Sequence, residues 1–148
     1  MTRDAITALF DRRRAAFERH DVAALVPDYA DDCVVESPTG GVHHGPTAVG
    51  LVLQMVFDAL DVKIHEESLL IDGDSVAQVV TIEGTDSGQF LGLPPTGKSF
   101  RIPAVFLYEF KDSQIARERR IYDFTGLLVQ IGLLKAKPSA SREREHHD

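Results

Sequence analysis

The sequence predicts an α+β fold, because its first half carries a helical pattern and its second half carries the pattern of strands. Apolar residues recur every three or four positions over residues 4–20 and again after Gly45, which is typical of amphipathic helices. From Val62 onward the apolar period falls to about two, which is typical of half-buried strands. Helices followed by long strands predict a curved antiparallel sheet wrapped around a few helices.

Three helices are predicted in the first half of the chain. The apolar stripe over residues 4–20 is interrupted by Arg13. Asp21 fits the N-cap of a short second helix within residues 22–30. The sequence Gly-Pro-Thr at residues 45–47 begins a third helix, which ends near Asp61. These helices supply the apolar surface that the sheet must cover.

The predicted strands are bounded by turn signals rich in Gly, Pro and Asp. They occupy residues 31–38, 62–71, 75–85, 99–110 and 114–124. The segments TGGVHHGP (39–46) and GQFLGLPPTGK (88–98) are too rich in glycine and proline for regular structure and are predicted to be loops.

Length and charge restrict the class of protein. A chain of 148 residues fits one domain, predicted over residues 1–134, and residues 135–148 lack apolar periodicity and are expected to form a loosely ordered tail. The formal charge of -7 argues against a nucleic-acid partner. Neither a basic and apolar leader nor an apolar run of ~18 residues is present, so we expect a cytoplasmic protein without a membrane partner.

The register of the last hairpin decides which side chains face the interior. If Asp112 and Ser113 form the tight turn, the more aromatic face of the hairpin is the expected interior side. On that face Asp123 lies opposite Ile102 and Arg119 lies opposite Phe106. A one-residue slip or a β-bulge would reverse this assignment and bring Glu109 inward instead.

Asp123 is the one acid in an otherwise uncharged run, residues 121–134. Enclosure by apolar walls raises the pKa of a carboxyl group and suits it to proton exchange near neutral pH. The alternative is a structural role, either as a cap of the turn that begins at Thr125 or as the partner of an arginine. Arg119 lies four residues away, about 13 Å along a strand, and is better placed to hold an anionic part of a ligand.

Two segments carry a family resemblance over roughly residues 4–134. ADDCVVESPTGGVHHGPTAV resembles the strand, turn and helix entry of the ketosteroid-isomerase-like, or nuclear-transport-factor-2-like, superfamily. GTDSGQFLGLPPTGKSF and the later YDFTGLLVQIGLL resemble the SnoaL-like polyketide cyclases, also called ester cyclases. The resemblance implies a cone formed by a bent sheet and three helices around a deep pocket. It also implies that Asp123 is the general acid and base of an intramolecular aldol ring closure that uses no metal or cofactor.

The chain departs from its relatives at several positions. Asp86 and Glu109 stand where the resemblance leads us to expect histidines. The three functional positions of the steroid isomerases correspond here to Ser37, Phe106 and Arg13, so ketosteroid isomerisation is not expected. No third ligand accompanies the histidines of the 39–46 loop at metal spacing, so no metal site is expected either.

The sequence therefore predicts a cofactor-independent enzyme that performs proton-transfer chemistry on a small hydrophobic carbonyl compound. The expected site has three catalytic residues, Asp123, Arg119 and Arg13. The residues expected around the substrate are Phe106, Tyr108, Phe57, Ile102, Glu36 and His44. Two alternatives stay open, namely a binding or dimerisation module without turnover and an epoxide or ester hydrolase of the limonene-epoxide-hydrolase type. We also expect a homodimer through the outer face of the sheet, with apolar surface from Val105, Leu107, Tyr122 and Phe124.

Overall fold

The computed structural model describes residues 1–135, and the greater part of the predicted tail lies outside the described residues. The elements follow one another in the order α1 (Arg3–Glu18), α2 (Val22–Leu25), η1 (Val26–Asp28), β1 (Tyr29–Ser37), β2 (Gly41–His44), α3 (Gly45–Leu60), β3 (Lys63–Asp72), β4 (Ser75–Thr85), η2 (Phe90–Gly92), β5 (Ser99–Lys111), β6 (Gln114–Tyr122) and α4 (Phe124–Gln130). The predicted α+β class is confirmed.

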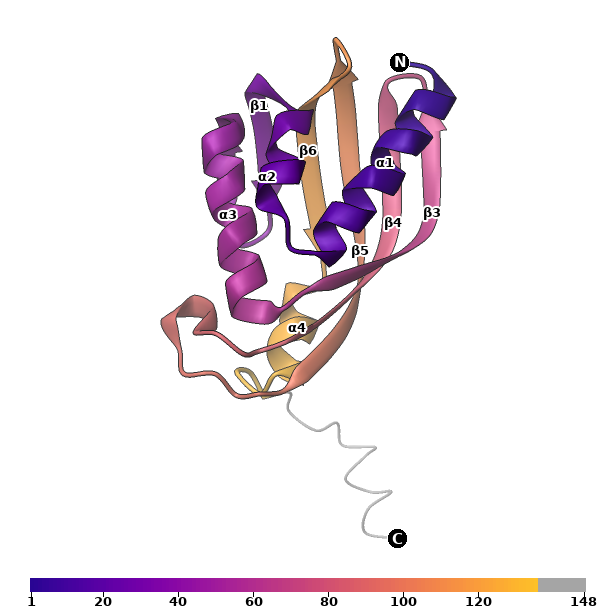
Figure 1. The fold of residues 1–148 in the computed structure, drawn as a ribbon. Helices are drawn as coiled ribbons and strands as arrows, with labels where there is room; N and C mark the ends of the chain where they lie inside the picture. The colour runs from indigo at the N-terminus through magenta and orange to yellow at the C-terminus, as the bar shows by residue number, and fades with distance from the viewer. Residues whose placement is uncertain (136–148) are drawn as a thin grey trace, which may run out of the picture.

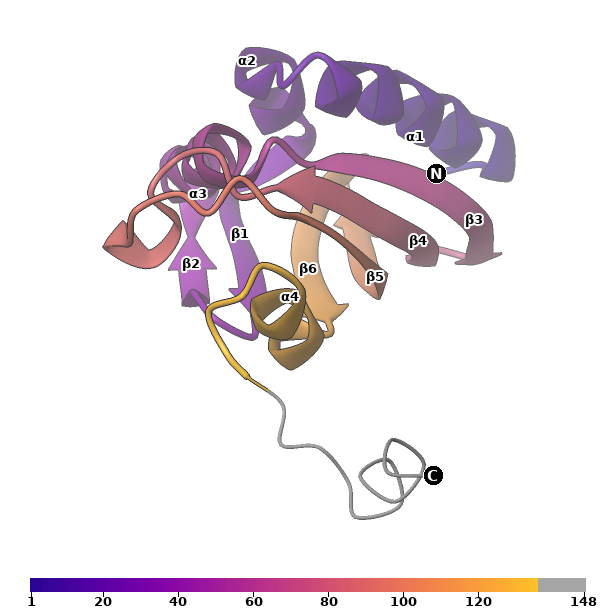
Figure 2. The same ribbon diagram turned by 90° about the horizontal axis from the view of Figure 1, so that it is seen from below.

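The six strands form one curved sheet in the order β2-β1-β6-β5-β4-β3. Figures 1 and 2 show α1, α2 and α3 on one side of this sheet, with α4 at the end of the cone where β6 finishes. The sheet is mixed, since β1 pairs with β6 in parallel, whereas the other pairs are antiparallel as predicted. Among residues 1–135, no helix has the length and apolar character needed to cross a membrane.

The helices begin where the sequence places their caps. Thr2 caps α1 by accepting a hydrogen bond from the backbone N–H of Ala5, and Asp21 caps α2 by accepting one from Ala24 at 3.1 Å. The buried face of α1 includes Arg13 between Phe10 and Ala16, so the cation that interrupts the apolar stripe lies inside the protein. A buried arginine requires partners, and these form part of the site described below.

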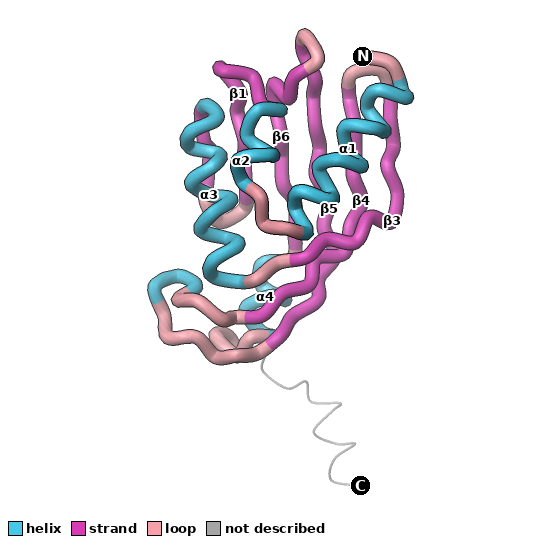
Figure 3. Tube along the Cα trace, viewed as in Figure 1, coloured by secondary structure: helices cyan, strands magenta, loops and turns pink. Residues whose placement is uncertain are grey.

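Two regular elements fall where loops or turns are predicted. Gly41–His44 forms the short strand β2 (Figure 2), which pairs with β1, and Phe124–Gln130 forms the helix α4 (Figure 3). The long loop at 86–98 keeps little regular structure, as predicted, and is held by Asp86, which is 1% exposed. Its carboxylate accepts hydrogen bonds from the backbone N–H and the hydroxyl of Thr96, at 3.0 and 2.9 Å.

The last hairpin turns as predicted but contains a β-bulge. Asp112 and Ser113 occupy the turn with positive φ, and Lys111 pairs with Gln114. The register then shifts between Glu109 and Phe110, so that β6 beyond the shift pairs one residue further along than a regular hairpin would. Every later side chain of β6 therefore points to the opposite face from the one predicted, while the predicted interior face of β5 is correct.

Candidate functional site

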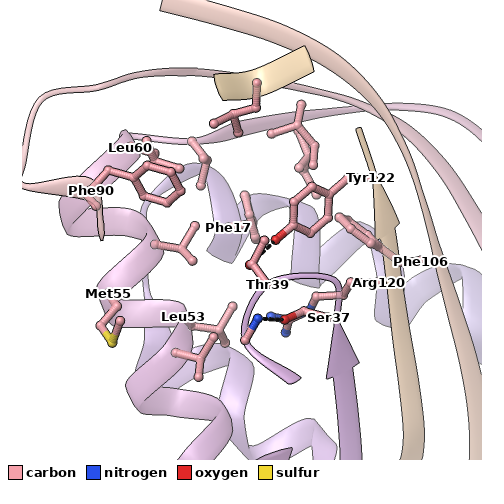
Figure 4. A pocket seen from close by; sticks show the side chains of 18 of the residues that line it. Phe17, Ser37, Thr39, Leu53, Met55, Leu60, Phe90, Phe106, Arg120 and Tyr122 are labelled. Carbon is pink, nitrogen blue, oxygen red and sulfur yellow. Dashed lines mark hydrogen bonds between the residues drawn. The ribbon is translucent and has the colours of Figure 1, made fainter. Parts of the chain in front are cut away.

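The fold encloses a cavity of about 780 Å³, within the usual size range of small-molecule sites. Its lining is largely apolar and comes from α1, α3, the sheet and the 86–98 loop. Figure 4 shows Phe90 and Leu60 on one side, and Tyr122, Phe106 and Arg120 on the other. Such a space can exclude water from a hydrophobic ligand.

A set of polar side chains lines the inner surface of the sheet and of α1. We call Arg13, Tyr29, Tyr108, Glu118 and Arg120 the polar cluster; all five line the cavity. The strand register explains three of them, because Tyr108 pairs with Glu118 and Phe106 pairs with Arg120 across β5 and β6. The cluster exists because the bulge turns Glu118 and Arg120 inward.

Hydrogen bonds connect the cluster from helix to sheet. Arg13 donates to Tyr29 Oη at 3.1 Å, and Tyr29 donates through a short hydrogen bond to Glu118 Oε1. Arg120 Nε donates to Glu118 Oε2 at 2.5 Å. Arg13 also forms an ion pair with Asp28 at 2.9 Å and donates to the carbonyl oxygen of Leu25 at 3.1 Å. Both carboxylate oxygens of Glu118 are thus engaged, and the carboxylate orients its neighbours.

Burial and charge set the protonation of the cluster. Burial alone raises the pKa of Glu118, but the charge and hydrogen bond of Arg120 outweigh it and lower that pKa, so Glu118 is a carboxylate at neutral pH. Burial, with the charge of Glu118 adding to it, raises the pKa of Tyr29 to about 12. The same two causes raise the pKa of Tyr108 well above 10. Both phenols are therefore neutral hydrogen-bond donors.

Two members of the cluster keep donors for a ligand. The terminal amino groups of Arg120 and the hydroxyl of Tyr108 have no hydrogen-bond partner among residues 1–135, although both side chains line the cavity. A guanidinium group and a neutral phenol that converge on an apolar space are suited to an oxygen that carries negative charge.

A second group of polar side chains lies on the β1 side of the cavity. Tyr122 and Thr39 share a hydrogen bond at 2.8 Å between their hydroxyl oxygens, and Ser37 lies beside Arg120 (Figure 4). His43 also lines the cavity. Among the described residues, 1–135, no cluster of three or more His, Cys, Asp or Glu side chains is arranged to hold a metal ion.

The structure contradicts the predicted placement of the two leading residues. Asp123 is exposed, does not line the cavity, and caps α4 by accepting a hydrogen bond from the backbone N–H of Gly126 at 2.9 Å. Arg119 is also exposed and pairs with Leu107 on the outer face. The bulge is the physical reason for both differences, because it reverses the faces of β6. Glu109 stays outside as well, since the shift changes the faces of β6 and not those of β5.

The other predicted residues divide into two groups. Arg13, Ile102, Phe106 and Tyr108 line the cavity as expected. Phe57, Glu36 and His44 do not: Phe57 packs in the core against Phe17 and stacks on His20, Glu36 pairs with Arg117 at 3.4 Å, and His44 is the exposed residue that precedes α3. Adjacent residues of a strand alternate in direction, so His43 takes the inward position instead of His44.

Sequence reasoning missed Glu118, Arg120 and Tyr29 as members of the site. No sequence signal marks the bulge, because polar residues occupy both faces of β6. Tyr29 was assigned to the end of a helical segment, whereas it begins β1. The buried Arg13 was the available signal, since a cation inside an apolar stripe requires acceptors nearby.

Known proteins share the sequence pattern and the fold of this chain. Residues 8–131 match the family model of the SnoaL-like polyketide cyclases. The chain belongs to this family. A nogalonic acid methyl ester cyclase of Streptomyces nogalater is 30% identical over 108 residues, which cover 72% of this chain and 78% of the relative. SnoaL-like polyketide cyclases are cyclase-type enzymes that bind small hydrophobic substrates.

Solved structures share the fold of this SnoaL-like protein at low identity. AclR of Streptomyces galilaeus superposes with a TM-score of 0.79 at 24% identity, and the match covers 95% of this chain and 89% of AclR. TsrD of Streptomyces laurentii has the same TM-score, 0.79, at 21% identity, with coverage of 90% of this chain and 99% of TsrD. At these identities the likeness shows the cone fold that the sequence resemblance implied.

Proposed function

We propose that this SnoaL-like protein closes a ring in a small hydrophobic carbonyl compound by an intramolecular aldol reaction. The observation that carries the proposal is the polar cluster, in which free donors of Arg120 and Tyr108 line a largely apolar cavity. Family membership supports the same class of chemistry. Arg120 lies opposite Phe106, where the sequence suggested Arg119, and the buried carboxylate that lines the cavity is Glu118, opposite Tyr108, instead of Asp123.

In the proposed reaction an enolate carbon of the substrate attacks a ketone carbon of the same molecule. A carbon–carbon bond forms, the π pair of the ketone moves to its oxygen, and that alkoxide takes up a proton. Arg120 stabilises the negative charge as it passes from the enolate oxygen to the new alkoxide, and the neutral phenol of Tyr108 donates a hydrogen bond or the proton to that alkoxide. Glu118 acts through Arg120 and Tyr29 as a positioning residue, because both of its oxygens are already engaged.

Nogalonic acid methyl ester appears in the name of the 30% identical relative, and it is the substrate with which to test the proposal. The protein is expected to convert it to an isomer of unchanged mass and different chromatographic retention, because an aldol addition adds and removes no atoms. The measurement is liquid chromatography with mass spectrometry, with boiled protein as the control. Absence of any isomer of this ester or of the corresponding free acid would contradict the proposal.

The same experiment separates the alternatives that the sequence left open. A hydrolase would add the elements of water, and in labelled water the product would carry the heavy oxygen isotope. A binding module would retain the ester unchanged in native mass spectrometry. Neither alternative has a specific observation in its favour, whereas the donor pair of Arg120 and Tyr108 favours oxyanion chemistry.

We propose further that the protein is a homodimer that pairs through the outer face of the sheet. Two corrections apply to the surface expected from sequence: Tyr122 lines the cavity, and Phe124 packs in α4 against Phe90. Leu107 and Ile121, 38% and 44% exposed, supply the outer apolar surface.

Sedimentation at micromolar concentration is expected to give a dimer mass. Leu107→Glu is expected to give a monomer, because it places two charges at the twofold contact. Leu51→Glu alters a more exposed leucine, 66% exposed on α3, and is expected to leave the dimer intact. A monomeric wild-type protein would refute the assembly.

A further inference from the structure

The cavity offers its ligand mainly hydrogen-bond donors at the polar cluster. The free groups of Arg120 and Tyr108 are donors, and the hydroxyl of Tyr29 already bonds both Arg13 and Glu118. The acceptor oxygens of Glu118 are both occupied. A ligand that satisfies Arg120 and Tyr108 must therefore bring an acceptor, and the cationic partner favours a negatively charged one.

The charges around Arg120 do not cancel this preference. On β6 Arg120 forms an ion pair with Glu118. From α1, Arg13 is connected to the same carboxylate by hydrogen bonds through Tyr29. Asp28 is engaged by two cations, Arg13 at 2.9 Å and the half-exposed Arg12 at 2.6 Å. The two buried acids thus face two largely buried arginines, Arg13 and Arg120, so the charges inside the protein balance and the preference rests on the free donors of Arg120 and Tyr108.

Other elements around the cavity bring few further charges toward Arg120. On the α1 and β3 side, Arg14 is paired with Glu66, and Gln78 donates to the same Glu66 at 3.2 Å. The β1 and β2 side contributes His43 and hydroxyl groups, and α3 contributes Asp58, which accepts a hydrogen bond from Gln54. Any anion preference must arise inside the cavity, because the whole chain carries a formal charge of -7 and repels anions from a distance.

We propose that the cavity binds its ligand as an oxyanion, specifically the enolate of an acidic enol such as a 1,3-dicarbonyl on an apolar ring system. The negative oxygen lies between the terminal amino groups of Arg120 and the hydroxyl of Tyr108, and the ring system fills the apolar part of the cavity.

This substrate class explains how a cyclase could work with no general base in the polar cluster. The cluster contains no carboxylate with a free oxygen and a raised pKa, and so has no strong general base. A substrate acidic enough to ionise in water needs none, because the site selects the enolate that already exists. The protein then has to stabilise charge and return one proton, which neutral Tyr108 can do.

The inference rests on the proposed function only in taking the cavity as the ligand site, and it can be tested without turnover. Two naphthoquinones of nearly the same shape serve as probes. 2-Hydroxy-1,4-naphthoquinone is an acidic enol that is ionised at neutral pH, whereas 2-methoxy-1,4-naphthoquinone cannot ionise. Calorimetric titration at neutral pH is expected to show about ten-fold or greater preference for the hydroxy compound, because charge-assisted hydrogen bonds form only with its anion.

Variants locate the preference within the cavity. Tyr108→Phe removes one uncharged donor. It is expected to weaken binding of the hydroxy compound about three- to ten-fold, with little change in binding of the methoxy compound. Arg120→Gln is expected to remove the preference. Arg119→Gln removes an equal charge from the outer face of the same strand and is expected to preserve it. Tyr108→Phe keeps the test decisive if loss of Arg120 prevents folding.

Equal affinity of the wild-type protein for the two probes would overturn the inference, as would equal losses in the Arg119 and Arg120 variants. The outcome is separable from that of the ring-closure experiment. Anion preference without ring closure would leave this inference standing and refute the proposed reaction. Ring closure without anion preference would do the reverse.

Discussion

Replacing Arg120 by glutamine is expected to lower the rate of ring closure of nogalonic acid methyl ester about 100- to 1000-fold, the usual effect of removing one oxyanion donor. Glutamine keeps a hydrogen-bond donor but has no charge, so the negative oxygen loses its cationic partner in a water-poor cavity. The loss should appear in kcat/KM, because Arg120 pairs with the negative oxygen both in the bound enolate and in the transition state. Steady-state kinetics by chromatography measures the effect.

Two matched variants control this experiment. Arg119→Gln changes the adjacent, exposed arginine of β6 and is expected to leave kcat within about two-fold, because it neither touches the cavity nor approaches the reacting atoms. Asp123→Asn tests the role implied by family resemblance. Asparagine caps a helix about as well as aspartate, so α4 should persist and turnover should continue.

The Asp123 and Arg120 variants together separate two assignments. If Asp123→Asn abolished turnover while Arg120→Gln did not, the acid of the YDFTGLL segment would be the catalytic group despite its exposed position. The proposed chemistry of the polar cluster would then be wrong. Circular dichroism of each variant shows whether a loss of rate reflects a loss of fold.

The sequence predicts this fold well because its signals are local and redundant. The period of the apolar residues, the cap at Asp21 and the Gly-Pro start of α3 each indicate the same elements that the structure contains. The strand β2 and the helix α4 were missed, since both are short. Short elements depend on tertiary contacts more than on local propensity.

The candidate site was predicted less well, and one residue accounts for most of the difference. On β5 the apolar side chains alternate strictly, so its interior face could be read directly. On β6 the residues Arg117 and Arg119 alternate with Glu118 and Arg120, and neither face is clearly apolar. The extra residue at the bulge, near Ala116, therefore reverses the face of every later side chain of β6, and the hydrophobic pattern gives no sign of it. Hydrophobic patterning fixes register only where one face is apolar.

Asp28→Asn is expected to lower the free energy of unfolding by about 3 kcal/mol, the lower end of the usual cost of breaking a buried ion pair. Asp28 is 9% exposed and pairs with Arg13, which is 8% exposed. Asparagine has nearly the same shape, so the change removes the negative charge and leaves a buried guanidinium less well compensated. Arg13 also supports Tyr29, so the loss is expected to loosen the polar cluster.

Asp11→Asn is the control for this prediction, because Asp11 pairs with Arg14 on the same helix but is 59% exposed at its side chain. Exposed pairs contribute little, so its unfolding free energy should change by less than about 0.5 kcal/mol. Urea titrations measure both variants, and an unchanged slope with denaturant shows that the difference lies in stability. Similar losses in the two variants would mean that burial of the Arg13 pair has no special importance. A large loss confined to Asp28→Asn would mean that the fold holds the cluster in place at its helical end, where Arg13 orients Tyr29 toward Glu118.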